Sequence, residues 1–546
     1  MSTGSRRPQA SAPPKPARKE TVAARAFKRR AAAAKRRAAR RRLVRGRIPG
    51  SAGAPHSLLA RCRGALAAIP VAARVCALVA FLNAVCWSLI VPPFQVPDEP
   101  DHFAYVQQLA ETASLPTSSN TEYSPEEMLA IRDLRNAQVR LRPEGRPLST
   151  STEQRELVQA LSQPLSRTGG GGTGFSASEP PLYYALETVP YGLASKGTIL
   201  SRIALMRLLS ALMGGLTALF SFLFLREALP GARWAWIVGG LGVAFAPLLA
   251  ASSGGITPDA LLFTVSAALF YALARAFRRG LTARSALAIG GIVAVGLMTK
   301  VNFIGLAPGA CLGLVALSVR QSRQAGRLAY SRMLAPGLAL AVSPAVLYAL
   351  VNFISGHPSF GVVSNEGGIV LNGHSLSREL SYIWQFYLPR LPWMHNDFGE
   401  LFVPRQLWFR GLVGLYGWND TVFPAWAYDL ALIPAGVIAA LCLRAVAISR
   451  AQLRRRGAEL AVYATMCIGL LVLIGASGYI ESVHLATEYA QPRYLVPMIA
   501  LWGAVLTLAA RGAGRRWGPV AGALLIVLVI GHDLFSQLQV IARYYS

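Results

Sequence analysis

The apolar run VCALVAFLNAVCWSLIVPP, from Val75 to Pro93, is long enough to cross a lipid bilayer and contains no charged side chain. It is followed directly by FQVPDEPDHFAYVQ, from Phe94 to Gln107, which places three carboxylates and a histidine where a membrane helix would end. The apolar region starts near residue 71 and lacks an A-x-A cleavage site, so we expect a retained membrane anchor and not a removed signal peptide.

Such runs recur along the 546-residue chain, which is 53% hydrophobic, only 15% charged and has a mean hydropathy of +0.40. This composition is typical of a polytopic membrane protein and not of a soluble multidomain one. We therefore predict an all-α membrane protein with about eleven transmembrane helices. The predicted spans lie near residues 71–91, 203–225, 234–251, 260–277, 285–299, 302–319, 333–354, 427–446, 459–479, 494–510 and 517–535.

The segments between the spans differ in charge, and the charge predicts their side of the membrane. Five alternate segments are basic and almost free of acids: REALPGAR, RAFRRGLTAR, RQSRQAGRLAYSR, LRAVAISRAQLRRRG and RGAGRR. Because basic residues are enriched in cytoplasmic loops, we expect a protein of the cytoplasmic membrane with its N-terminus inside the cell and its C-terminus outside. The outer segments are then 92–202, 252–259, the surroundings of Lys300, 355–426 and 480–493.

Residues 1–70 form a basic leader before the membrane domain, which spans 71–546. The first 50 residues contain 17 Lys and Arg but a single acid, Glu20, and have little apolar surface to bury. We expect a disordered cytoplasmic tail that is attracted to the anionic lipids of the inner leaflet. A nucleic-acid-binding arm is the alternative, but such a run binds phosphate without reading sequence, so we expect no specific nucleic-acid partner.

The two long outer segments differ in composition. Segment 92–202 contains thirteen of the 26 acidic residues, and stretches such as SPEEMLAIRDLRNAQVRL predict short amphipathic helices. Segment 355–426 is rich in aromatic side chains, which fit either an interfacial belt or a surface that stacks on sugar rings. Its tryptophans are Trp384, Trp393, Trp408, Trp418 and Trp426. The six cysteines of the chain form no CxxC pair, so neither a zinc site nor a disulfide framework is indicated.

Four short motifs follow the acidic stretch on the predicted outer side. They are EPPLYYALETVPYGL at 179–193, GGITPDALLFTVSAALFYAL with Asp259, GLMTKVNFIGLAPG with Lys300, and YAQPRYLVPMIALW with Arg493 and Tyr494. With the acidic pair after the first span, their order resembles that of the GT-C glycosyltransferases, polytopic enzymes that take a sugar from a polyprenyl-phosphate carrier. PFQVPDEPDHFAYV further resembles a bacterial family of predicted membrane proteins, a domain of unknown function clustered with these enzymes.

The resemblance implies a base for an acceptor hydroxyl, and the residues at the membrane edge supply candidates. Asp98 and Glu99 are the candidate bases. If the chain is helical after Pro97, His102 lies on the same face as Asp98, four residues on, and is expected to orient the base or the acceptor. The alternative is a helix start, where acidic residues are favoured, and Asp101 is assigned to that role.

Sugar transfer from a lipid phosphate also needs positive charge on the leaving group. Lys300 and Arg493 are the candidate phosphate-binding residues, since charges at a membrane edge are costly and tend to be functional. We expect the two side chains to converge near the outer face. The alternatives are a Lys300 side chain that extends to the interface and an Arg493 that pairs with Glu481 or Glu488.

Asp259 and Tyr494 complete the candidate substrate-binding residues. Asp259 follows Thr257-Pro258 at the start of a helix, so a capping role is its alternative. No cofactor is identified from the sequence. A divalent cation held by the carboxylate and histidine groups is the remaining alternative. It is the less favoured one, because no second acidic cluster with ligand spacing adjoins them.

Taken together, the residues and the resemblance predict an inverting integral membrane glycosyltransferase. It would transfer a hexose or pentose from a polyprenyl-phosphate donor to a glycan, lipid or protein acceptor of a bacterial cell envelope. A transporter or flippase of a lipid-linked sugar is the first alternative, although the sequence has no inverted repeat and no matching pair of broken helices. A non-catalytic scaffold for envelope assembly is the second.

Overall fold

A computed structural model describes residues 67–545, apart from gaps at 117–121, 148–149, 174–175, 326–330, 355–375, 399–403 and 483–490. Within it, residues from Ile69 onward form one compact unit. The basic tail at 1–70 lies outside the described residues except for its last four, so its disorder and its lipid contacts stay predictions.

Long apolar helices make up most of this unit and confirm the all-α polytopic membrane class. Within the described residues, eight helical stretches are long and apolar enough to cross a membrane. They are α3 (Val71–Ile90), α9 (Ile199–Ala228), α12 (Asp259–Arg279), η3 (Val301–Gly305) with α14 (Ala307–Ala325), α19 (Ala425–Arg454), α20 (Gly457–Ile480), η6 (Pro492–Met498) with α21 (Ile499–Gly512), and α22 (Gly514–Tyr545).

The three other predicted spans are helical but are shorter or broken. The run near 234–251 forms α10 (Trp236–Ala244) and α11 (Pro247–Ser253), which are bent by 51° at Pro247; counted as one span, they give nine in the described part of the chain. α13 (Ala283–Leu297) has 15 residues and spans about 22 Å, less than a bilayer core. α15 (Ser331–Ile354) has an apolar part of only Leu334–Leu350. The predicted count of eleven is therefore not confirmed.

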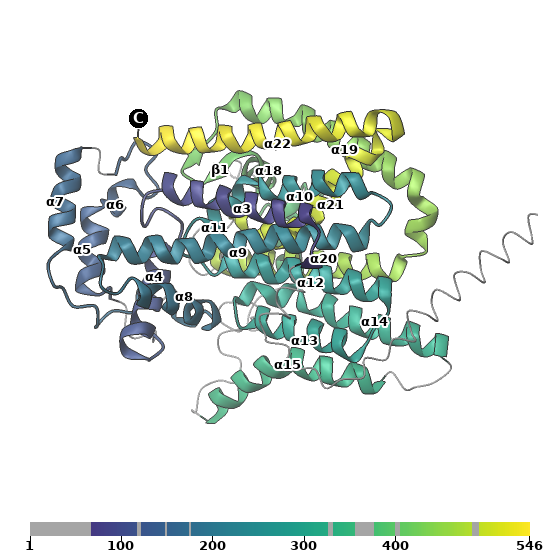
Figure 1. Ribbon diagram of the computed structural model, residues 1–546, viewed down its shortest axis with the longest axis horizontal. Coiled ribbons are helices and arrows are strands. Elements are labelled where there is room, and N and C mark those ends of the chain that lie inside the picture. The colour runs from purple at the N-terminus through teal and green to yellow at the C-terminus, as the bar shows by residue number, and fades with distance from the viewer. Residues whose placement is uncertain are drawn as a thin grey trace, which may run out of the picture. The chain divides into compact units, whose positions relative to one another are not determined.

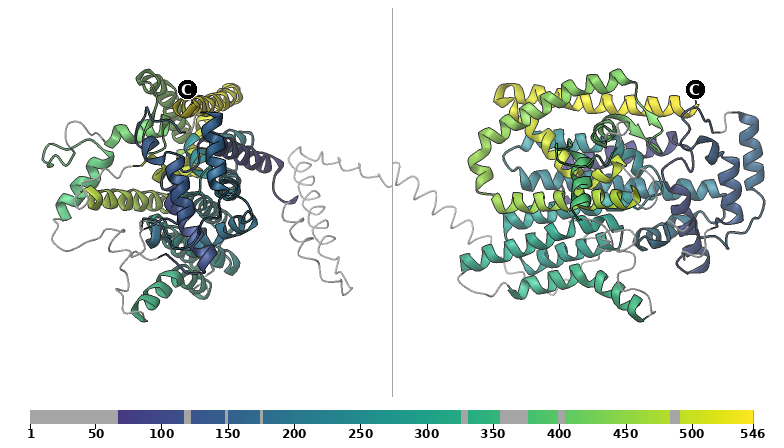
Figure 2. Two further views of the ribbon diagram at one scale, coloured as in Figure 1. Left: turned by 90° about the vertical axis from the view of Figure 1, so that its left-hand side faces the viewer. Right: turned by 180° about the vertical axis from the view of Figure 1, so that it is seen from behind.

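The bundle is organised around α9 and α12. α3 and α12 pack along α9, α13 packs along α15, and α19 packs along α21. Figures 1 and 2 show α22 on one side of α9 and α12, and α13 to α15 on the opposite side. Glycines permit the closest approach: a Cβ on Gly239 of α10 would lie 2.3 Å from the carbonyl oxygen of Gly503 in α21.

Short helices of the first outer segment gather at one end of the bundle (Figure 1). Their starts are capped locally: Ser124 accepts from Glu127 N, and Thr150 and Glu153 form a capping box. The predicted short helices of this segment are thus present. They are α4 (Glu99–Thr112), α5 (Pro125–Asp133), α6 (Asn136–Val139), α7 (Ser151–Leu161), η1 (Ser176–Ser178) and α8 (Leu182–Leu193).

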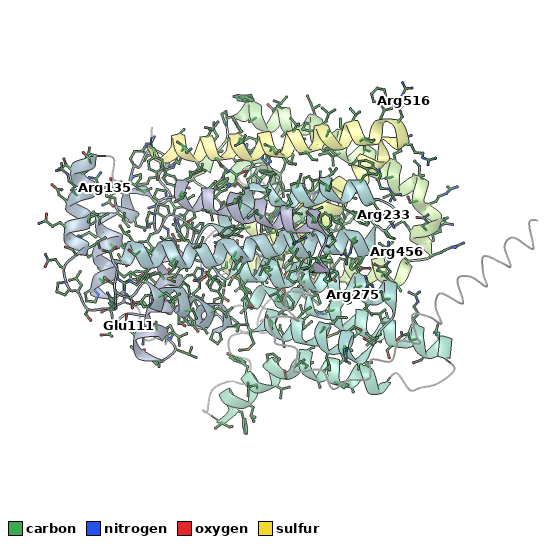
Figure 3. The ribbon with its side chains drawn as sticks, in the orientation of Figure 1. Glu111, Arg135, Arg233, Arg275, Arg456 and Arg516 are labelled. Atoms are coloured by element: carbon green, nitrogen blue, oxygen red, sulfur yellow. The ribbon has the colours of Figure 1, made fainter. Side chains whose placement is uncertain are left out.

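The basic loops lie at the other end of the bundle. Figure 3 places Arg233 of η2 (Arg233–Ala235) together with Arg275, Arg456 and Arg516 at the end opposite Glu111 and Arg135. Arg233, Arg275, Arg456 and Arg516 come from four different segments that the charge pattern assigned to one side. The common side is therefore confirmed, whereas its cytoplasmic identity stays a prediction.

The second outer segment is described only in part. It contains α17 (Leu376–Tyr387), α18 (Pro404–Gly414) and an antiparallel hairpin of β1 (Leu415–Tyr416) and β2 (Thr421–Val422). Trp408 is buried, and its Nε1 donates to the Phe386 carbonyl oxygen at 2.8 Å. This tryptophan is consequently part of the core and not of an interfacial belt, in contrast to the exposed Trp393 and Trp426.

Candidate active site

Four charged residues from distant parts of the sequence form one buried cluster. Asp98 precedes α4, Asp259 is the first residue of α12, Lys300 follows α13, and Arg493 lies in η6. Lys300 Nζ donates to Asp259 Oδ1 at 2.8 Å, and Arg493 Nη2 donates to Asp98 Oδ2 at 2.5 Å. Arg493 Nε lies 3.5 Å from Asp259 Oδ2, which joins the two pairs. We call these four residues the charge cluster.

The cluster brings Lys300 and Arg493 together, as predicted. Both cations contact the same carboxylate, that of Asp259, through its two oxygens. Tyr494 lies beside them, with its ring centroid 5.7 Å from the Arg493 guanidinium carbon and 6.0 Å from Lys300 Nζ. This geometry is that of a cation–π contact, and it gives the two cations an aromatic wall.

Asp98 has a backbone conformation that directs its side chain away from its own helix. Its φ of 64° lies in the left-handed region, which Asp tolerates better than most residues. Its side chain makes no capping hydrogen bond with α4 and instead accepts from Arg493. The carboxylate is therefore not used to start the helix, although the helix does begin at the next residue.

The electrostatics of Asp98 follow from its partner. Burial by itself would raise the pKa of this carboxyl, but the Arg493 guanidinium, with a smaller contribution from Lys300, outweighs burial and holds the pKa below its usual value. Asp98 is thus an anion at neutral pH. The negative charge of Asp259 is stabilised by its cation partners and also by the helix dipole, because Asp259 lies at the N-terminus of α12.

His102 lies next to the charge cluster and contacts Tyr184 of α8. Its Nδ1 is 3.0 Å from the Tyr184 hydroxyl, and the Tyr184 ring stacks on Tyr105 at 3.7 Å. Burial lowers the pKa of His102 to about 3, with Asp98 opposing that shift, so the ring is neutral at physiological pH. Its backbone N–H donates to the Asp98 carbonyl oxygen at 3.0 Å, which places it one turn after Asp98, as predicted.

Glu99 belongs to a different group of contacts, although it follows Asp98 directly. Arg207 of α9 donates from Nε to Glu99 Oε1 at 2.7 Å and from Nη2 to Glu99 Oε2 at 2.6 Å. The backbone N–H groups of Phe94 and Ile256 donate to the same two oxygens at 2.8 and 3.0 Å. Four donors therefore occupy this carboxylate, and its side chain is completely buried. Its contacts are those of a structural anchor.

Two cluster neighbours were not assigned a role from the sequence. Glu179 Oε1 lies 3.9 Å from Lys300 Nζ, and Tyr184 contacts His102. Both belong to the EPPLYYALETVPYGL motif, so the motif was the available signal, but its spacing does not reveal which of its side chains turn inward. Of the expected partners of Arg493, Glu488 lies outside the described residues, and the partners observed are Asp98 and Asp259.

Metal binding by the cluster stays a hypothesis. Among the described residues, no group of three or more His, Cys, Asp and Glu side chains is arranged to hold a metal ion.

A comparison with protein-family models matches residues 81–502 to the family described as predicted membrane protein (DUF2142). The chain belongs to the DUF2142 family. The matched region contains every residue of the charge cluster, from Asp98 to Arg493, and leaves out the basic tail. The expected membership of a family of predicted membrane proteins is thereby confirmed, and this DUF2142 protein is a multi-pass membrane protein.

Solved structures similar to this DUF2142 chain include two of ArnT from Cupriavidus metallidurans, one in the apo state and one bound to undecaprenyl phosphate. Each is 15% identical to it. The apo structure aligns over 88% of this chain and 76% of ArnT with a TM-score of 0.41, and the bound structure over 85% and 75% with a TM-score of 0.42. No curated protein matches the sequence.

Proposed function

We propose that this protein is an integral membrane glycosyltransferase of the GT-C type. It transfers a sugar from a polyprenyl-phosphate donor to an acceptor of the cell envelope on the extracytoplasmic face. The observation that carries the proposal is the charge cluster. Two carboxylates and two cations from four distant segments, each preceding or beginning a helix, meet in one buried site.

Lys300 and Arg493 are proposed to bind the donor phosphate. In the structure both cations are held by carboxylates, so their side chains are already positioned and a phosphate competes with the carboxylates for them. The planar guanidinium of Arg493 suits two phosphate oxygens, and Lys300 adds a compact charge. Negative charge that develops on the bridging oxygen as the sugar departs is then stabilised by cations that already contact the phosphate.

Asp98 is proposed to be the general base. It would accept the proton of the acceptor hydroxyl while the hydroxyl oxygen bonds to the anomeric carbon and the phosphate leaves with the bonding electrons. A single displacement of this kind inverts the anomeric configuration. Phosphate binding to Arg493 weakens the contact that holds the pKa of Asp98 down, so donor binding raises that pKa and makes the carboxylate a better base.

The sequence motifs support the same assignment. The segments around Asp98, Asp259, Lys300 and Arg493 resemble those of GT-C glycosyltransferases in order and in predicted side. Glu99, in contrast, is assigned to the structure because four donors already occupy it.

The test is replacement of Asp98 by Asn in the full-length protein, produced in a deletion strain of the source bacterium. Asp98→Asn keeps the size and removes the basicity, and we expect a loss of product of about 100-fold or more. Mass analysis of cell-envelope glycans measures the product. Glu144→Gln, an exposed acid of the same outer segment, is the matched control and should behave as the wild type.

The result also separates the alternative functions. An Asp98→Asn protein that is made at normal levels and restores the full wild-type glycan would refute the catalytic assignment. A wild-type protein that moves a lipid-linked sugar across the membrane but transfers no sugar to an acceptor would instead favour a flippase.

A further inference from the structure

A cavity of ≈ 50 Å³ adjoins the charge cluster and shares Arg493 with it. It also includes Pro97, the residue before Asp98. Its remaining walls come from the end of α3, from α11, from the β1–β2 hairpin and from the last turns of α22. We call it the Gln95 cavity, after the polar residue that lines it next to Pro97. None of the roles assigned above uses the walls contributed by α11, the hairpin or α22.

Gln95 lines this cavity, and its side chain has no hydrogen bond to the described part of the chain. The residue is 1% exposed, and within those residues neither its Oε1 nor its Nε2 has a partner. An unpaired buried amide destabilises the folded protein, so such a group points to a ligand. The backbone around it is well held: Phe94 N donates to Glu99 at 2.8 Å, and Asn136 Nδ2 donates to the Phe94 carbonyl oxygen at 2.7 Å.

Thr421 of β2 also lines the cavity and has an unpaired polar group. It is 3% exposed, and its Oγ1 has no hydrogen-bond partner among the described residues. Trp87 and Tyr416 complete this side as apolar walls, because their polar atoms bond elsewhere: the Trp87 indole donates to Asp533 at 3.1 Å, and the Tyr416 hydroxyl donates to Ser536 at 2.8 Å. The cavity thus combines neutral hydrogen-bonding groups with aromatic ring faces.

The residues that line the cavity indicate what kind of ligand it can bind. Among the described residues no carboxylate lines the cavity, which disfavours a cation, and the one charged side chain in its described walls is Arg493. A carboxamide and a hydroxyl both donate and accept, as the hydroxyl groups of a sugar do. At about 10–15 Å³ for each water-sized group, the volume suits roughly three to five non-hydrogen atoms.

We infer that the Gln95 cavity binds a small hydroxyl-bearing part of a sugar ring, with Gln95 and Thr421 as its hydrogen-bonding residues. The inference rests on the proposed function, since Arg493 would hold the phosphate next to this sugar. Two sources share the chemistry: the sugar of the lipid-linked donor and a sugar of the acceptor. The cavity then determines which sugars are used, whereas the charge cluster determines that a phosphate is bound.

The test measures binding by the full-length protein in detergent micelles, using native mass spectrometry. The probes are undecaprenyl phosphate, undecaprenyl phosphate carrying a neutral hexose or pentose, and the methyl glycosides of the same sugars. The variants are Gln95→Leu and Thr421→Val, which keep the approximate size and remove hydrogen bonding. Gln321→Leu, whose partly buried amide lies in α14 away from the cavity, and Ser266→Ala in α12 are matched controls.

We expect the wild type to bind a glycosylated lipid at least tenfold more tightly than undecaprenyl phosphate, or to bind a methyl glycoside. Gln95→Leu should reduce that sugar-dependent binding about tenfold, and Thr421→Val should reduce it in the same direction, while binding of undecaprenyl phosphate is unchanged. If the variants lose the preference for the glycosylated lipid over undecaprenyl phosphate, the ligand is the donor sugar. If the variants keep that preference and lose only the binding of the methyl glycosides, the ligand is an acceptor sugar.

The thermal midpoint separates a ligand site from a structural role. Because the amide is unpaired, Gln95→Leu should leave the midpoint unchanged or raise it. Sugar-dependent binding that is unaffected by both variants, or a wild type that shows none with any probe, overturns the inference. A wild type that binds glycosides but no undecaprenyl phosphate overturns the proposed donor and not the cavity.

Discussion

Adjacent carboxylates at the end of the first membrane helix have different surroundings. The left-handed backbone at Asp98 turns its side chain toward Arg493, whereas Glu99, one residue later, faces Arg207. Acidity alone does not distinguish the two. What differs is the set of donors. Among the described residues, Arg493 is the side chain that donates to Asp98, and a phosphate can take over this cation. Glu99 receives four donors, of which two are backbone groups.

His102 leads to a prediction about the pH dependence of stability. Its pKa in the folded protein is lowered to about 3 by burial, with Lys300 and Arg493 also opposing protonation and Asp98 and Asp259 favouring it. In the unfolded chain its pKa is about 6.5. Between these values the unfolded state binds more protons, so stability falls as the pH falls below 6.5, by at most about 1.4 kcal/mol for each pH unit.

His102→Gln removes this titration and retains a group able to bond Tyr184. We expect the thermal midpoint of the wild type to fall more steeply between pH 6.5 and 4.5 than that of His102→Gln. Differential scanning fluorimetry of both proteins in the same detergent measures the two slopes. If the thermal midpoints of the two proteins fall equally between pH 6.5 and 4.5, His102 is protonated in the folded and unfolded states alike, and its pKa is not lowered by folding.

Arg493 leads to a second prediction at this scale, about the geometry of the phosphate contact. Arg493→Lys retains the charge but loses the planar fork, and Arg493→Gln loses both. Binding of undecaprenyl phosphate should fall in the order wild type, Arg493→Lys, Arg493→Gln, with about tenfold lost at the first step, as measured by native mass spectrometry. Wild-type affinity in Arg493→Gln would place the lipid phosphate elsewhere.

At the scale of elements, the pair of Glu99 and Arg207 joins parts of the chain that are far apart in sequence. Arg207 also donates to the carbonyl oxygens of Ser88, in the last turn of α3, and of Val91 and Pro92, just after it, at 2.9, 2.7 and 2.9 Å. Ile256, whose N–H donates to Glu99, lies between α11 and α12. The pair therefore connects α3, α4, α9 and the segment before α12.

Breaking this pair should destabilise the protein without directly altering the charge cluster. Glu99→Gln leaves the Arg207 charge buried and partly unpaired, which costs about 3–5 kcal/mol. Asp133→Asn, which breaks the exposed pair with Arg132, is the matched control and should leave the thermal midpoint unchanged. Thermal midpoints in detergent measure both. A Glu99→Gln protein of wild-type stability that has lost transfer activity would return Glu99 to the catalytic residues.

The sequence predicted the elements better than their contacts. Each of the eleven apolar runs is helical, because the length of a hydrophobic run is a local property of the sequence. Lys300 and Arg493 converge as predicted, but their shared partner Asp259 was not predicted. The contacts of Glu99 were not predictable, since its partner Arg207 is 108 positions away. The burial of Trp408 likewise depends on contacts with α17, and aromatic composition does not reveal them.

At the scale of the whole membrane unit, the ends of the helices carry different charges. Four basic loop residues lie together at one end, and the short helices with Glu111 and Arg135 lie at the other (Figure 3). The C-terminal end of α22 is on the side of the short helices, because Arg543 donates to the carbonyl oxygens of Val139 and Arg142 at 3.0 and 2.6 Å. The charge cluster involves the N-terminal ends of α4 and α12, next to these short helices.

This arrangement predicts that the end with the short helices is extracytoplasmic. Gly170, in the same outer loop, is a poor place for a label because a Cβ there would lie 2.2 Å from Ser124 N. Gln163 is exposed, and a Cβ on Gly231 in a basic loop would make only an ordinary contact, 4.0 Å from the Arg511 side chain. In a background with all six native cysteines replaced by alanine, a membrane-impermeant thiol reagent should label Gln163→Cys in intact cells and Gly231→Cys only after lysis. The opposite pattern would place the charge cluster on the cytoplasmic side, where a donor exposed outside the cell does not reach Arg493.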